Sequence, residues 1–309
     1  MQSKPPSTVK IAPTNSFAVT QADGEIRHKV PARWNKAKKY SKNKQERGIW
    51  PLTSNCHPGT TTPVLPFPMS FNIPTKTMSC ILHIETSTDV CSVALSQDGV
   101  CLHEKIDTNG RRHAEILAPF VEEAVSFADS HAIPLDAVSV SAGPGSYTGL
   151  RIGVSTAKGL CYGRDLKLIS IPTLKVLCTP ILLYREDIPD NALLCPMIDA
   201  RRMEVYTAIY DRALHEVVPT DAVIVNENSF AEILDKQPVF FFGNGADKCR
   251  DTLKHPNAHF IEGIVPKASN MLPLAERALA LNETEDVAYY EPFYLKQFVA
   301  GKSRNLLNG

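Results

Sequence analysis

A glycine-rich segment joins a buried apolar run to a helical one. Residues 143–149 read Gly-Pro-Gly-Ser-Tyr-Thr-Gly, between a strand expected over 136–141 and a helix expected over 150–162. Backbone N–H groups and the helix dipole at such a junction attract anions. The spacing is nevertheless GxGxxxG, which is neither the dinucleotide fingerprint nor a P-loop. Two interpretations of Gly143 and Gly145 therefore stay open. They could form a nucleotide site, or they could only permit a tight turn and close packing.

His113 is the histidine whose position could suit a metal. Two imidazoles four residues apart on one helix face can hold an ion, but the residue four positions on is Leu117. The His, Asp and Glu residues elsewhere form no evident ligand set, so a metal site fails on ligand count. We expect no catalytic residue, no metal and no cofactor bound by this chain alone.

Two aspartates, Asp89 and Asp199, occupy polar turns between expected strands. Nucleotide-dependent proteins of similar design place carboxylates in such turns to hold a metal-bound phosphate, although turns favour aspartate for conformational reasons alone. Arg201 and Arg202 follow the second aspartate. They could bind phosphate, but we favour the interpretation that they flank a hairpin.

Small residues recur every four positions in the helix expected over 150–162. One row comprises Gly149, Gly153 and Ala157, and a second comprises Ser155, Gly159 and Gly163. Glycine costs about 1 kcal/mol relative to alanine inside a helix, so these rows indicate close approach of another backbone. Spacing does not decide whether that backbone belongs to this chain or to a partner.

The elements around these residues repeat along the chain. A β-meander over 81–106, an amphipathic helix over 112–130, a strand, the glycine loop and its helix form a βββαβα-type unit, which a strand over 166–171 and a helix starting near 172–173 complete. Strands over 195–198 and 204–210, a helix over 229–234, a strand over 239–242 and Gly243-Asn244-Gly245 begin a second, similar unit. A late helix is expected over 271–281. This pattern predicts a duplicated α/β fold.

Charge divides the 309-residue chain unevenly, although its formal net charge is +0. Residues 1–77 hold 12 of the 33 Lys and Arg but only 3 of the 33 Asp and Glu, together with ten of the 23 prolines. We expect this segment to be a disordered, dispensable extension, with Met78 as the functional start. The alternative is an RNA-binding arm using Trp34, Tyr40 and Trp50. The acidic remainder argues against gripping nucleic acid unaided.

The cysteines and the lack of a targeting signal predict the cellular compartment of the protein. The eight cysteines contain no CxxC pair and no zinc spacing, which is typical of reduced thiols in a cytosolic protein. The sequence has neither an apolar run long enough for a membrane helix nor a signal-peptide pattern. A cytoplasmic location without membrane contact is expected.

Five segments together closely resemble the TsaB (YeaZ) family, from Met78 to about Phe298. These segments are Ile84-Glu85-Thr86-Ser87, Cys91-Ser92-Val93-Ala94-Leu95, His113-Ala114-Glu115-Ile116-Leu117-Ala118-Pro119, the glycine segment from Ser141 to Gly153, and Ile198-Asp199-Ala200-Arg201-Arg202-Met203-Glu204-Val205-Tyr206. The resemblance implies a duplicated actin-like, Hsp70-like or sugar-kinase-like fold. Its first domain would span 78–180 and bind the partner, and its second would span 181–309, with the late helix packing back on the first.

The resemblance also implies a function. Members of this family are non-catalytic subunits in the synthesis of N6-threonylcarbamoyladenosine next to the tRNA anticodon. They dimerise with the catalytic subunit TsaD and work with an ATPase, TsaE, so that the complex uses ATP and tRNA is met indirectly. TsaD carries paired metal-binding histidines on the corresponding helix, where Leu117 takes the second place here. A homodimer in the absence of TsaD stays open.

The partner surface is expected on the two helices that follow the meander. The residues assigned to it are Arg112, His113, Leu117, Arg151, Gly153 and Ala157. The competing hypothesis is a free-standing metal- or nucleotide-dependent enzyme of the same superfamily, either glycoprotease-like or sugar-kinase-like. Bound metal or nucleotide turnover would favour that enzyme.

Overall fold

The computed structural model describes residues 78–110 and 112–296. The expectations for residues 1–77, both the disordered extension and the RNA-binding arm, fall outside these residues. Among the helices described, none is both long enough and apolar enough to cross a membrane.

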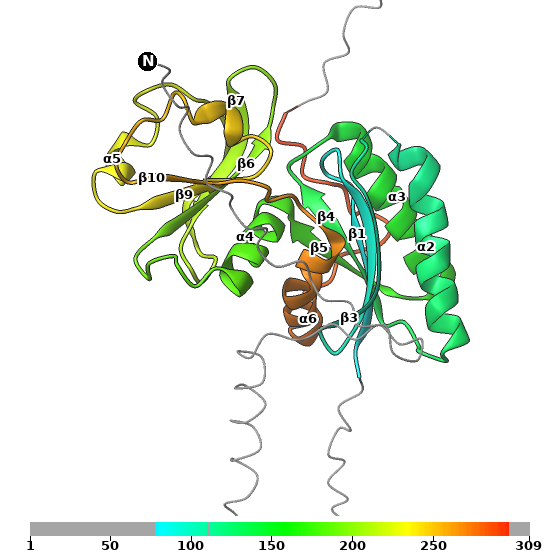
Figure 1. Ribbon diagram of the computed structural model, residues 1–309. Helices are drawn as coiled ribbons and strands as arrows, with labels where there is room; N and C mark the ends of the chain where they lie inside the picture. The colour runs from blue at the N-terminus through cyan, green and yellow to red at the C-terminus, as the bar shows by residue number, and fades with distance from the viewer. Residues whose placement is uncertain (1–77, 111, 297–309) are drawn as a thin grey trace, which may run out of the picture. The chain divides into compact units, whose positions relative to one another are not determined.

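The first sheet has five strands in the order β3-β2-β1-β4-β5 (Figure 1). Their bounds are β1 Cys80–Glu85, β2 Cys91–Gln97, β3 Val100–Asp107, β4 Ala137–Gly143 and β5 Lys167–Pro172. The first three pair antiparallel as the predicted meander, and β4 and β5 add in parallel. The strand β1 is buried along its whole length, because it lies at the centre and is covered on both faces.

The second sheet repeats this order as β10-β9-β6-β7-β8. Its strands are β6 Leu193–Asp199, β7 Glu204–Tyr210, β8 Glu216–Ile224, β9 Val239–Phe242 and β10 Ala258–Ile261. Again three strands pair antiparallel and two add in parallel to the central one. The repeated order confirms the predicted duplicated, actin-like α/β fold.

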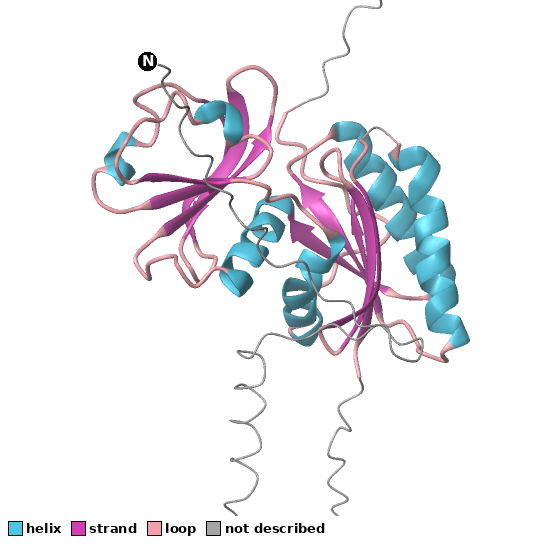
Figure 2. Ribbon diagram, in the orientation of Figure 1, coloured by secondary structure: helices cyan, strands magenta, loops and turns pink. Residues whose placement is uncertain are grey.

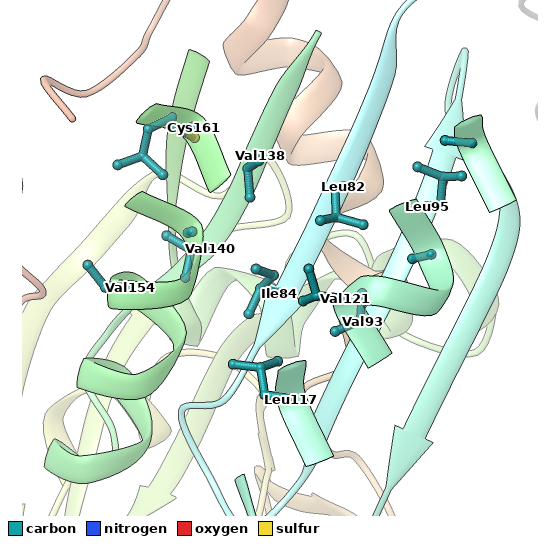
Figure 3. Close-up of a cluster of buried hydrophobic side chains, with 14 of the residues drawn as sticks. Leu82, Ile84, Val93, Leu95, Leu117, Val121, Val138, Val140, Val154 and Cys161 are labelled. Carbon is teal, nitrogen blue, oxygen red and sulfur yellow. The ribbon is translucent and has the colours of Figure 1, made fainter. Parts of the chain in front are cut away.

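Two 18-residue helices, α2 (His113–Ser130) and α3 (Tyr147–Arg164), cover one face of the first sheet (Figure 2). The amphipathic pattern of α2 places Leu117 and Val121 against the sheet, where they meet Ile84 and Val93 (Figure 3). Ser146 begins α3 by accepting a hydrogen bond from the Gly149 N–H, and Asp165 ends it in the left-handed region.

The opposite face of the first sheet packs against α6 (Leu272–Ala280) and the preceding 3-10 turn η2 (Ala268–Met271). A further helix, α4 (Thr173–Tyr184), contacts β4 and β5 of the first sheet and β6 of the second. The side chains of Leu174, Leu177 and Ile181 join the core of the second sheet.

Helices of the second half are much reduced. The helix expected over 229–234 is the single turn α5 (Ala231–Leu234), and the residues after Gly243-Asn244-Gly245 form only the 3-10 turn η1 (Asp247–Cys249). These short elements still cover one face of the second sheet with Leu234, Ala246 and Cys249. The two halves therefore have sheets of the same topology but different sets of helices.

Candidate functional site

The glycine loop between β4 and α3 is filled by the chain's own backbone. A Cβ atom at Gly145 would lie under 3.0 Å from the carbonyl oxygen of Ser87, and one at Gly143 would lie 2.6 Å from that of Phe293. The Ser146 N–H donates to the Ser87 carbonyl at 2.7 Å. The contacts favour the packing interpretation of Gly143 and Gly145, because part of the N–H set that would cradle a phosphate is already engaged.

The first row of small residues on α3 faces inward. Cβ atoms at Gly149 and Gly153 would each lie under 3.0 Å from Thr86, from its carbonyl oxygen and its hydroxyl respectively. Gly153 and Ala157 are both buried. The expectation that these two residues contact a partner is therefore wrong, because Ala157 is buried in the core and Gly153 is covered by the Thr86 side chain from the loop after β1.

His113 and Leu117 are buried as well. The His113 side chain is 7% exposed, with its Nε2 atom 3.3 Å from the Val90 carbonyl oxygen, and Leu117 is 1% exposed in the core. These two residues cannot form the predicted contact surface, whereas Arg112 and Arg151 are exposed and can. Within the described residues, no three His, Cys, Asp or Glu side chains come together as a metal site would require.

The two aspartates of the corresponding turns have different surroundings. A carboxylate oxygen of Asp199 accepts the Arg201 N–H at 3.0 Å and forms an ion pair with Lys248. The Asp199 N–H donates to the Asn244 side chain at 3.0 Å. Asp89 is exposed and lies beside Gly110. The Asp199 carboxylate is thus already paired with Lys248.

The cysteines do not resemble catalytic thiols. Seven lie within the described residues, all are free, and every one except the partly exposed Cys101 is buried. Burial raises the pKa of the Cys91 thiol to about 12 and that of Cys161 to about 11. Because the thiolate is the nucleophile, these groups are poorly suited to covalent catalysis at neutral pH.

A carboxyl group that sequence reasoning did not single out lies at the end of β1. Glu85 is fully buried, its Oε1 atom accepts the Ser87 N–H at 2.7 Å, and burial raises its pKa. Its Oε2 atom and the Thr86 and Ser87 hydroxyls lack a hydrogen-bond partner among the described residues. Glu85 was visible in the sequence only as part of a motif, and its burial depends on the glycine-mediated approach of α3.

The second row of small residues, Ser155, Gly159 and Gly163, faces solvent. In the part of the chain that the structure describes, no atom lies within 4 Å of a Cβ atom placed at Gly159 or Gly163. Tyr162 stands beside this row and is 87% exposed. On α2, which packs alongside, Ala114 and Ala118 are also exposed. We call the set Ala114, Ala118, Ser155, Gly159, Tyr162 and Gly163 the docking face.

The C-terminal strap, residues 285–296, runs across the first sheet and the glycine loop. It begins with the Glu285 N–H donating to the Leu168 carbonyl of β5 at 2.8 Å. Lys158 of α3 then donates to the carbonyls of Ala288 and Tyr290, at 3.0 Å each. Finally the Phe293 N–H donates to the Ala142 carbonyl at 2.7 Å, directly before the glycine loop.

Comparison with known proteins shows the family to which this chain is related. The family model described as "TsaD: tRNA N6-adenosine threonylcarbamoyltransferase" matches residues 103–302. The tRNA threonylcarbamoyladenosine biosynthesis protein TsaB of Escherichia coli is 31% identical over 228 residues, which cover 72% of this chain and 96% of that protein. This chain belongs to the TsaB family. The TsaB protein of Haemophilus influenzae is 29% identical, with 72% and 95% covered.

Solved structures agree with the TsaB assignment. A Pseudomonas aeruginosa protein described as having similarity to peptidase YEAZ superposes with a TM-score of 0.61 at 26% identity, covering 71% of this chain and 100% of that one. The YeaZ protein of the same organism gives a TM-score of 0.56 at 27% identity, with the same coverage. The resemblance found in the sequence, which named the TsaB (YeaZ) family, is confirmed.

Proposed function

We propose that this chain is the non-catalytic subunit of a tRNA N6-threonylcarbamoyladenosine modification complex. The observation that carries the proposal is its similarity to the E. coli TsaB protein along 96% of that protein, whose name assigns it to this biosynthesis. The modification would be made in the cytoplasm by a TsaD-like catalytic subunit, with a TsaE-like ATPase that consumes ATP. This chain alone would bind no cofactor.

The buried residues support a non-catalytic role. Leu117 fills a core position where a second helical histidine would be needed, and a leucine cannot ligate a metal. Lys248 neutralises the turn carboxylate of Asp199. The buried thiols have raised pKa values. These features argue against a thiol nucleophile, a two-histidine metal site on α2 and a phosphate-side carboxylate at Asp199.

The docking face supports a helix-packing partner, which we assign to the TsaD-like subunit. Glycine inside an exposed helix costs about 1 kcal/mol relative to alanine, and no neighbour among the described residues uses the space at Gly159 or Gly163. A partner helix laid across this row would approach the α3 backbone closely. A standard interface buries roughly 800 Å² on each partner, an area that the outer faces of α2 and α3 together can supply.

The test is reconstitution from purified components. Unmodified tRNA, threonine, bicarbonate, ATP, the adenylate-forming enzyme, the TsaD-like subunit and the TsaE-like ATPase are combined with and without this chain. We expect modified adenosine only when both this chain and the TsaD-like subunit are present. Modification in the absence of the TsaD-like subunit would refute the non-catalytic role, and full modification in the absence of this chain would refute its membership of the complex.

A second candidate is a free-standing enzyme, and one observation favours it. The Pseudomonas aeruginosa neighbour is described as similar to a peptidase. A glycoprotease-like or sugar-kinase-like activity would need bound metal or nucleotide turnover by this chain alone. Metal analysis and ATP hydrolysis measurements on the purified chain distinguish the two candidates.

A further inference from the structure

A row of cations and aromatic rings begins at the N-terminus of α3. The rings of Tyr147 and Tyr294 lie 4.8 Å apart, so the strap places a second aromatic side chain against the first residue of α3. The guanidinium group of Arg151 lies 5.4 Å from the centroid of the Tyr147 ring and donates to the Tyr147 hydroxyl at 2.9 Å. An exposed arginine is thus held over an aromatic pair.

The row continues through the strap to the turn between β6 and β7. Lys296, two residues after Tyr294, forms an ion pair with Glu204 at the start of β7. Arg201 and Arg202 lie just before Glu204, and both are exposed. The strap therefore joins the aromatic pair of α3 to the arginine turn by contacts between neighbouring residues.

The arginine turn has an unusual backbone. Arg201 and Arg202 have φ values of 73° and 51°, a region that favours glycine and is uncommon for two successive arginines. The turn is held by the Arg201 N–H donating to Asp199 and the Glu204 N–H donating to the Arg201 carbonyl. Neither guanidinium group has an ion pair or hydrogen bond among the described residues. Two long cations are therefore fixed at their base and unpaired at their tips.

Acidic groups near this row are mostly paired. Asp199 is paired with Lys248, and Glu204 with Lys296. Asp221 lies near Lys296, and Glu291 lies near Tyr294. The guanidinium groups of Arg201 and Arg202 remain unpaired among the described residues, and that of Arg151 is engaged with Tyr147. A guanidinium fork donates in pairs to phosphate or carboxylate oxygens, and tRNA is the phosphate-rich partner that the proposed function supplies.

We propose that Arg151, Tyr147, Tyr294, Arg201 and Arg202 form an RNA contact surface of this chain. The arginines would bind tRNA phosphates, and the tyrosine pair would stack an unpaired base, which is the way proteins recognise single-stranded segments of RNA. The proposal rests on the proposed function, which supplies tRNA as the substrate of the complex. It replaces a purely indirect encounter with tRNA by a direct one.

The contact adds to binding by the partner and does not act alone. Three guanidinium groups release few counterions, and the chain from residue 78 on is acidic overall. The isolated chain should therefore bind tRNA weakly. In the complex, the same contacts add to those of the TsaD-like subunit without a second association cost, so their loss becomes measurable.

The test measures the affinity of unmodified tRNA for the assembled complex over a series of salt concentrations. In the double variant Arg201→Gln, Arg202→Gln, we expect affinity to fall roughly tenfold and the slope of log K against log salt to decrease by about 2. Tyr294→Leu should weaken binding while leaving the slope unchanged, because it removes stacking and no charge. The matched control Arg277→Gln, at an exposed position on α6, should behave as wild type.

Each other outcome contradicts a distinct statement. Unchanged affinity and slope in the double variant, with the complex intact by gel filtration, would overturn the RNA surface and leave the proposed function standing. Loss of co-elution with the TsaD-like subunit would mean that the arginines bind protein. If the isolated wild-type chain bound ATP and the double variant did not, with tRNA affinity unchanged, the arginines would form a nucleotide site and the RNA surface would be overturned. A wild-type complex that does not assemble would overturn the proposed function itself.

Discussion

Gly153 and Gly159 lie six residues apart on the same helix, yet they have opposite surroundings. A Cβ atom at Gly153 would meet the Thr86 hydroxyl, whereas one at Gly159 would meet nothing within 4 Å. Both residues reduce helix propensity equally. Packing within the chain requires the glycine at position 153. The glycine at position 159 has no such role, and we attribute it to contact with a partner protein.

The same substitution at the two glycines should have opposite effects on stability. Gly153→Ala should lower the free energy of unfolding by about 1–3 kcal/mol, because the added methyl group overpacks the contact with the buried Thr86 side chain. Gly159→Ala should raise it by up to about 1 kcal/mol through helix propensity. Chemical denaturation of the isolated chain measures both. A stable Gly153→Ala variant would show that Thr86 can move away from α3.

His83 is the second residue whose surroundings decide its chemistry. Its ring nitrogens lie 2.7 Å from the hydroxyls of Ser139 and Ser96, and burial lowers its pKa to about 3. The folded chain therefore holds a neutral imidazole that joins three strands of the first sheet. The unfolded chain binds a proton near pH 6.5, whereas the folded chain does so only near pH 3.

Stability should consequently fall as pH falls from about 6.5 towards 3. The His83→Gln variant keeps a donor and an acceptor in the same place but does not titrate, so its stability should depend less on pH over this range. Glu85, whose pKa burial raises, contributes in both proteins and cancels in the comparison. Urea denaturation at several pH values is the measurement, with His259→Gln, an exposed imidazole, as control. Equal pH dependence of wild type and His83→Gln would contradict the assignment.

At the scale of elements, α2 and α3 combine two tasks on opposite faces. Their inner faces build the core of the first sheet, and their outer faces carry the docking face. The sequence predicted both helices and both rows of small residues on α3. It could not say which row faces inward, because a four-residue spacing is equally regular on either side of a helix. The row of Gly149 and Gly153 faces inward because it packs against Thr86, a loop residue whose position helical periodicity cannot predict.

A bulky residue in the docking face should separate this chain from its partner without unfolding it. Gly159→Leu places a side chain where we propose a helix of the TsaD-like subunit, so association should weaken by about 1–3 kcal/mol. The melting temperature of the isolated chain should not fall, because leucine favours the helix and the space is open. Gel-filtration co-elution tests this, and Ala280→Leu, exposed on α6, is the matched control. Normal co-elution of Gly159→Leu would move the interface elsewhere.

Two strands escaped prediction for identifiable reasons. The edge strand β8 contains Pro219 and two charged residues, Glu216 and Asp221, so it lacks a clean apolar alternation. The strand β10 is only four residues long and mostly half-exposed. The buried strand β9 is a continuous apolar run, and β1 is fully buried although it contains His83 and Glu85. The predicted bounds of both strands agree with the structure to within one residue. An edge position alone did not hide a strand, because the edge strands β3 and β5 were predicted. The strand β8 was missed because it lacks an apolar alternation, and β10 because it is short.

At the scale of the whole molecule, residues 78–296 share elements between the two sheets. The helix α4 contacts β4, β5 and β6, and the strap bonds to β5, the glycine loop and β7. The sequence predicted two similar units but contained no signal for this sharing. A helix that packs against two sheets has the same apolar sequence pattern as a helix buried in one core. Shared packing couples the stability of the sheets.

We therefore expect the two sheets to unfold in one cooperative transition. Leu177→Ala, in the fully buried part of α4 that faces the second sheet, should lower the free energy of unfolding by about 2–5 kcal/mol. Because unfolding is shared, hydrogen exchange measured by mass spectrometry should show faster exchange in β1 and β4 of the first sheet as well as in β6 and β9. If only β6 and β9 lose protection, the sheets unfold independently, and α4 belongs energetically to the second sheet alone.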